Sequence, residues 1–107
     1  MERLPEEIIE AIRDLTEMRY EDPTFVGEEC IAVKNGVVKM RVESWTYDCV
    51  TYAADHGRTI EDHDEEIFQE WQREETRKGF SLLNNSFDFD PHAGVFGQHF
   101  AFFYKSL

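Results

Sequence analysis

The stretch 59–66 reads TIEDHDEE and surrounds one histidine with carboxylates. His63 precedes Glu66 by three residues, which is the helical spacing of Glu/His ligand pairs. Mixed histidine and carboxylate ligands suit zinc, manganese or iron. His92 follows the alternating Asp88 and Asp90, so it could add a third ligand. One alternative is therefore a small metal-binding protein or metal-dependent hydrolase that uses His63, Glu66 and His92.

The sequence carries none of the specific motifs that accompany such chemistry. It has no HExxH pattern, no GxSxG pattern, no phosphate-binding glycine loop and no CxxC pair. Cys30 and Cys49 are its only cysteines, and we expect both to be reduced thiols. We therefore expect no cofactor and favour a non-enzymatic function.

The same stretch also has the features of a helix start. Thr59 followed by Asp62 resembles a capping box, and Gly79 suits a left-handed stop, so we expect a helix from Thr59 to Lys78. Acids in a first turn are stabilised by the helix dipole. However, like charges four residues apart repel each other. The start of a helix therefore does not require all five acids of this stretch, and the surplus could serve a function.

The other elements predict a single α+β domain over residues 1–107. A helix is expected from Pro5 to Tyr20, because Ile8, Ile12 and Leu15 recur at helical spacing. Asn35-Gly36 predicts a type I′ hairpin in which Val33 faces Val38. This register places the side chains of Ile31, Val33, Val38, Met40 and Val42 on one apolar face.

The rest of the chain predicts further strands. Residues 43–56 fit either a strand or a helix that ends at Gly57, and we favour a strand followed by a short turn or helix. Residues 80–104 alternate as antiparallel strands around a turn at 91–94, and Asn84-Asn85 suggests one more short hairpin. We expect a mostly antiparallel sheet of four or five strands with two helices packed on one face.

The charge suggests the class of partner. The chain has 107 residues, with 23 acids against 11 bases and a formal net charge of −12. Such a field repels nucleic acid and anionic membranes and attracts basic surfaces. No stretch approaches the ~20 apolar residues of a membrane span. The N-terminus is acidic and lacks a signal-peptide pattern, so we expect a cytoplasmic protein.

These observations favour a small acidic protein-binding module. It would present a carboxylate surface to a basic, nucleic-acid-handling protein, as inhibitors and immunity or anti-defence proteins do as a class. If both helices cover one face of the sheet, their outer sides form one broad negative surface. The expected partner-binding residues are Glu61, Asp62, Asp64, Glu65, Glu66, Glu6, Glu10, Asp14 and Glu17.

The C-terminal aromatics suggest a third role. Phe100, Phe102 and Tyr104 would share one face of a strand, and Phe103 would lie on the other. A strand that is apolar on both faces is either central in a layered core or packed against another chain. Two helices on one face would leave the other uncovered, so we expect a homodimer or an accessory subunit that uses these four residues.

Overall fold

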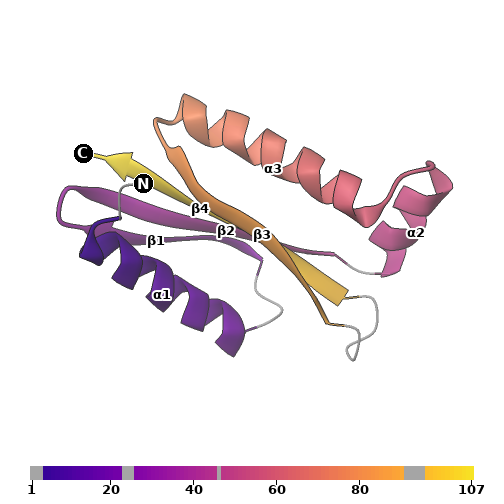
Figure 1. Cartoon of the computed structure of the whole chain (residues 1–107), viewed down its shortest axis with the longest axis horizontal. Coiled ribbons are helices and arrows are strands. Elements are labelled where there is room, and N and C mark those ends of the chain that lie inside the picture. Colours follow the sequence, from indigo (N-terminus) through magenta and orange to yellow (C-terminus); the bar gives the residue numbers. More distant parts are fainter. Residues whose placement is uncertain (1–3, 23–25, 46, 91–95) are drawn as a thin grey trace.

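The computed structural model confirms the α+β fold (Figure 1). It describes the backbone of residues 4–22, 26–45, 47–90 and 96–107, and all side chains in these ranges except those of 44–50, 60, 84–90 and 96–98. Along the chain the elements are α1 (Glu6–Glu21), β1 (Gly27–Val33), β2 (Gly36–Trp45), α2 (Tyr47–Asp55), α3 (Ile60–Arg77), β3 (Ser81–Asp90) and β4 (Phe96–Ser106).

The strands form a four-stranded sheet in the order β1-β2-β4-β3. Each neighbouring pair is antiparallel. The sheet is therefore two hairpins, β1–β2 and β3–β4, joined side by side through their inner strands. The two central strands, β2 and β4, are bonded on both sides, while β1 and β3 form the edges.

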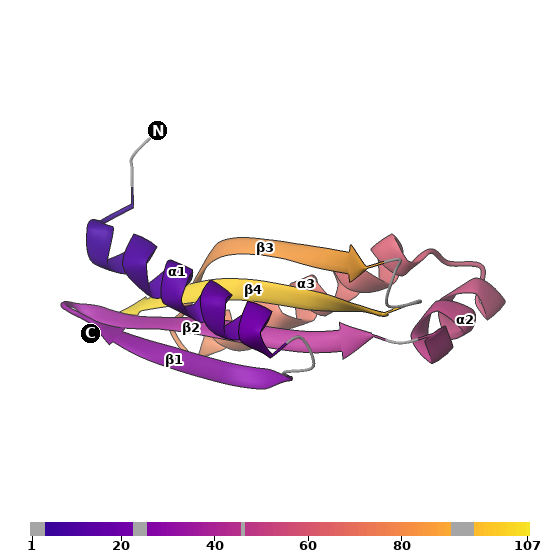
Figure 2. The same cartoon turned by 90° about the horizontal axis from the view of Figure 1, so that it is seen from below.

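The helices cover opposite faces of this sheet, so the predicted placement of two helices on one face is wrong. Figure 2 shows α1 in front of the sheet and α3 behind it. Val38 and Met40 pack into the core under α1, whereas Lys39 bonds Glu75 of α3. β4 is apolar on both sides, and each side is covered by its own helix: Phe102 packs on the α1 side and Phe103 on the α3 side.

Helix α1 buries one narrow stripe. Ile8, Ala11 and Leu15 are 1–5% exposed and pack against β2 and β4. Arg19 continues the stripe and is 3% exposed, with its guanidinium 3.8 Å from the centre of the Phe100 ring. This contact lets an arginine occupy a core position, because the cation lies on an aromatic face.

The β1–β2 hairpin differs from the prediction in its turn. Val33 pairs with Gly36 and Ile31 with Val38, so Lys34-Asn35 forms the turn and the register moves by two residues. Asn35 does not have a positive φ, so the turn is not type I′. A Cβ on Gly36 would overlap the carbonyl oxygen of Lys105, so this glycine provides space for β4. A two-residue shift preserves the faces, and the apolar face is as predicted.

The ambiguous stretch 43–56 divides into a strand end and a helix. β2 continues to Trp45 and α2 follows it, which agrees with the favoured order of a strand and then a short turn or helix, and α2 adds a third helix to the two that we expected in the fold. Its Ala53 is buried, and the following Gly57 has a φ of +69°, which suits the helix stop considered above. Asn84 and Asn85 lie inside β3, at and after a register irregularity, so the extra hairpin predicted there is wrong. The predicted turn at 91–94 lies outside the described residues.

Among the described helices, none combines the length and the apolar character that crossing a bilayer requires.

Candidate functional site

The acids of 59–66 divide into an exposed group and one buried residue. The predicted capping box is present: the Thr59 side chain accepts a hydrogen bond from the backbone N–H of Asp62, and Asp62 accepts one from the N–H of Thr59. Glu61, Asp62, Glu65 and Glu66 are exposed on α3. Asp64 is only 6% exposed, so it cannot take part in a surface contact, and its assignment as a partner-binding residue is wrong.

Asp64 instead joins α3 to the sheet. Its carboxylate accepts a hydrogen bond from Nδ1 of His99 on β4, and His99 has no exposed surface. The His99 ring also contacts Phe68 edge-on at 6.3 Å between centroids, and His63 lies 6.1 Å away. An Asp–His pair can serve acid–base catalysis when it reaches a substrate. This pair lies under α3, where a substrate would have to displace the helix, so we assign it a structural role.

A second polar cluster joins α3 to β2. Glu75 has no exposed surface, and its carboxylate accepts a hydrogen bond from Nζ of Lys39 at 2.9 Å. Arg41 and Lys78 approach the same carboxylate at 3.4 and 3.5 Å. A buried charge is costly unless it is paired and hydrogen-bonded, and these three cations meet that condition. The cluster thus explains why an acidic helix packs on a strand that carries two basic residues.

The outer part of this cluster shifts the pKa of one carboxyl. Glu74 accepts a hydrogen bond from Arg41 Nη1 at 2.8 Å. That hydrogen bond, with the positive charge of Arg41, holds the pKa of Glu74 below its ordinary value. Glu28 of β1 lies on the other side of Arg41, 3.5 Å from its Nε. Sequence spacing did not indicate this network, because its members are about 35 positions apart in the chain.

Helix α1 carries the other predicted binding residues, and all of them are exposed. Glu6, Glu10, Asp14 and Glu17 are joined by Glu21, which was not among the expected partner-binding residues. Steps of three or four residues keep side chains on one side of a helix, so these five carboxylates form one row, which we call the α1 carboxylate row. Within the described part of the chain, no ion pair is formed by Glu10, Asp14, Glu17 or Glu21.

The two acidic groups do not form one surface. α1, which carries the α1 carboxylate row, covers one side of the sheet, and α3, which carries the other exposed acids, covers the opposite side (Figure 2). The single broad negative surface that we expected required both helices on one face, so that expectation is wrong. A flat partner can contact only one of the two groups at a time.

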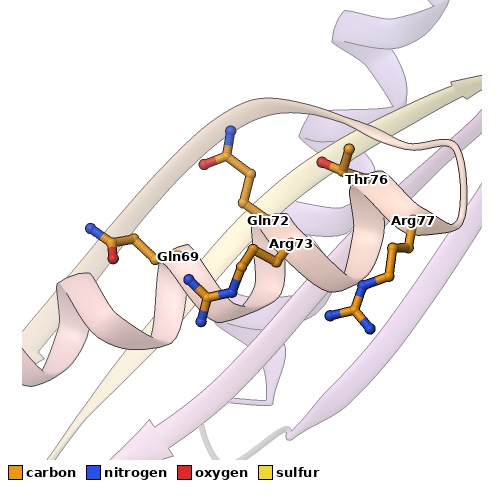
Figure 3. Close-up of a pocket in the computed structure, with 5 residues that line it drawn as sticks. All are labelled: Gln69, Gln72, Arg73, Thr76 and Arg77. Carbon is orange, nitrogen blue, oxygen red and sulfur yellow. The ribbon is translucent and has the colours of Figure 1, made fainter.

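The outer surface of α3 also changes sign along its length. Its first turns are acidic, but its second half has a shallow hollow lined by Gln69, Gln72, Arg73, Thr76 and Arg77. Figure 3 shows Arg73 and Arg77 pointing to one side of the helix, one turn apart. All five lining residues come from one helix, so the hollow is not an enclosed binding pocket. α3 therefore offers exposed acids first and exposed bases in its second half, whereas α1 carries the exposed base Arg13 among its acids.

The residues expected to form an oligomer interface are mostly interior. Phe100, Phe102 and Phe103 are 8%, 2% and 1% exposed, and only Tyr104 is half-buried. They are covered by α1 and α3, which removes the reason for assigning them to contact with another chain. Homodimerisation itself stays a prediction that the solution mass would test.

The metal interpretation gains no support from the described residues. His63 lies beside His99, whereas Glu66 pairs with Arg58 at 2.9 Å, so the two do not converge. His92 lies outside the described residues. Among the side chains that the structure describes, no three from histidine, cysteine or acidic residues gather as a metal site would require.

Comparison with protein-family models, with curated proteins and with solved structures gave no match. The function is therefore argued from the geometry of this chain.

Proposed function

We propose that this protein is a binding module that meets a basic protein partner through the α1 carboxylate row. The observation that carries the proposal is the row itself: exposed acids aligned on one helix, of which Glu10, Asp14, Glu17 and Glu21 have no ion pair among the described residues. By contrast, other acids of the chain have evident structural roles. Glu75 balances buried cations, and Asp62 caps α3.

The row has an energetic consequence that favours a cationic partner. Glu6 and Glu10, Glu10 and Asp14, and Glu17 and Glu21 are like-charged pairs four residues apart, and each such pair costs about 0.2–0.5 kcal/mol. A basic surface placed against the row would relieve this repulsion. The row spans about 22 Å at 1.5 Å per residue, which is long enough to follow an extended basic cleft.

The most natural partner is a nucleic-acid-handling protein, because such proteins carry lysine and arginine clefts shaped for phosphates. A carboxylate row that occupies such a cleft would exclude nucleic acid, and the binding module would act as an inhibitor. Long-range attraction from a net charge of −12 would accelerate the encounter and would be screened by salt.

Two matched variants test the proposal. The first neutralises four of the five acids of the α1 carboxylate row (Glu10→Gln, Asp14→Asn, Glu17→Gln, Glu21→Gln). The second neutralises the four acids of α3 that lie outside the capping box, the core and the ion-pair network of Arg41 (Glu61→Gln, Glu65→Gln, Glu66→Gln, Glu70→Gln). Each variant loses four negative charges, so the two have the same net charge and differ only in the face that is neutralised.

Each tagged protein is used to capture partners from extracts of its own cells, and bound proteins are identified by mass spectrometry. We expect a basic partner to be captured by the wild type and by the α3 variant, to be lost by the α1 variant, and to be released as NaCl rises above ~0.5 M. Equal capture by both variants would show that the row is not the contact. Elemental analysis of the same samples tests the metal interpretation directly.

A further inference from the structure

Strand β1 is an open edge of the sheet. Figure 2 shows it at the border, with α1 over one face, and none of the described strands lies beyond it. Its central residues Glu28, Glu29, Cys30 and Ala32 are all exposed. An edge strand has a row of backbone N–H and C=O groups without strand partners, which an extended segment of another chain can use.

One backbone hydrogen bond at the turn end of β2 identifies the outward-facing groups of β1. The N–H of Leu107 donates to the carbonyl of Asn35 at 2.9 Å. In an antiparallel pair, only every second residue exchanges backbone hydrogen bonds with the residue opposite it. Asn35 bonds Leu107 across from it, so the odd-numbered residues of β2 bond β4 and the even-numbered ones bond β1. The partners of those even-numbered residues are Glu29, Ile31 and Val33. The N–H and C=O groups of Glu28, Cys30 and Ala32 therefore point away from the sheet.

The side chains at this edge are acidic on both faces. Ile31 packs on the α1 side, so Glu29, two residues before it, also lies on that side. Glu28 lies on the α3 side, where it contacts Arg41 at 3.5 Å and still keeps 44% of its side-chain surface. An added strand would thus meet a carboxylate on either face. A second copy of β1 would bring the same carboxylates on a chain of net charge −12, so self-pairing is disfavoured.

We propose that β1 accepts an extended lysine- or arginine-bearing segment of the partner as a fifth strand of the sheet. The backbone groups of Glu28, Cys30 and Ala32 would supply the ladder, and Glu28 and Glu29 would select positive side chains. This inference rests on the proposed function for the charge of the partner. It specifies the site at which one segment of that partner binds, strand β1, and the extended conformation in which it binds.

Amide hydrogen exchange tests the inference with a defined probe, a short peptide in which lysine alternates with valine. At a peptide concentration ~10 times Kd, a group that is covered only in the complex should exchange about 10-fold more slowly. We expect that slowing at the N–H groups of Glu28, Cys30 and Ala32. Glu29 and Ile31 should change little, because their N–H groups already bond β2. The same peptide with glutamate in place of lysine should give no slowing.

A pair of variants removes the contact without removing the strand. Cys30→Pro deletes one outward N–H, which an edge strand tolerates, whereas Cys30→Val keeps it. With circular dichroism showing both folded, we expect at least 10-fold weaker peptide binding for the proline variant and wild-type binding for the valine variant. If Cys30→Pro does not fold, exchange in the wild type with and without peptide decides the question alone.

The outcomes separate this inference from the proposed function. Salt-sensitive peptide binding that is lost in the α1 variant but leaves exchange at Cys30 unchanged would overturn the added strand and leave the proposed function standing. Protection of Glu28, Cys30 and Ala32 that rises with protein concentration in the absence of peptide would show that a second copy occupies the edge, and would also overturn it.

Discussion

At the scale of single residues, the acids of this chain differ in what surrounds them and not in their type. Asp62 and Asp64 are two positions apart, yet the first caps a helix at the surface and the second is buried against His99. Glu74 and Glu75 are adjacent, and one is half-exposed while the other has no exposed surface. Each role follows from which side of α3 the residue occupies.

Replacing Asp64 should test its structural role. Asp64→Ala removes a partner of the buried His99, and we expect a loss of about 1–3 kcal/mol in the free energy of unfolding. Glu61→Ala changes an exposed acid of the same helix and should alter stability by less than about 0.5 kcal/mol. Urea denaturation measures both. Equal stabilities for the two variants would mean that the Asp64–His99 contact does not hold α3 to the sheet.

Cys30 should be a slow nucleophile. Partial burial raises the pKa of its thiol, and Glu28 and Glu29 add to this effect, while Lys39 opposes it. The thiolate is the reactive form, so a raised pKa leaves less of it at neutral pH. In a Cys49→Ser background, iodoacetamide should therefore alkylate Cys30 more slowly than a free cysteine peptide, with the rise in rate displaced to higher pH. A rate equal to or above that of the peptide would contradict this assignment.

At the scale of elements, each helix is held to the sheet by different chemistry. α1 packs through aliphatic side chains, with Arg19 lying over Phe100. α3 combines an apolar cluster around Trp71 with the ion pairs of Glu75 and Glu74. The stability of the contact between α3 and β2 therefore depends on pH, whereas the contact of α1 with the sheet depends mainly on apolar packing.

The Glu74–Arg41 contact should make the protein less stable as the pH falls. Because the pKa of Glu74 is lowered in the folded state, the contact contributes stability above the ordinary glutamate pKa and loses it as pH falls through the lowered one. Glu74→Gln should thus lower Tm at pH 7, and the difference from wild type should shrink in acid. Glu70→Gln, an exposed control on the same helix, should show no such trend. A difference that stays constant with pH would exclude the ionised contact.

At the scale of the whole molecule, the charge of −12 acts on stability as well as on binding. The α1 carboxylate row is exposed, whereas the cations nearest to Glu75 lie on the opposite side of the sheet. Salt screens exposed charges more than buried pairs, so the repulsion should weaken before the internal network does.

Salt should therefore stabilise this protein. Raising NaCl from ~10 mM to ~150 mM shortens the Debye length from about 30 Å to about 8 Å, and we expect Tm to rise. The variant with four of the five acids of the α1 carboxylate row neutralised should show a smaller rise, because the three repulsive pairs named above are gone. Thermal unfolding followed by circular dichroism measures both. A Tm that falls with salt would mean that exposed ion pairs outweigh the repulsion.

The sequence alone determined several local features, because they depend on neighbours along the chain. The Thr59 cap, the left-handed stop at Gly79, the α1 stripe and the alternation of Phe100, Phe102 and Phe103 were all read from spacing, and all are present. The apolar face of the hairpin was predicted correctly although the register was wrong, because a shift of two residues keeps every side chain on its own face.

Only the tertiary structure decided which face each helix covers, and the site depends on that choice. Contacts such as Asp64–His99 and Lys39–Glu75 join residues about 35 positions apart, so no local pattern encodes them. Their formation placed Asp64 inside, separated the two acidic groups and enclosed Phe103. The physical reason is that β4 is apolar on both sides, and burying both sides of one strand requires a helix on each.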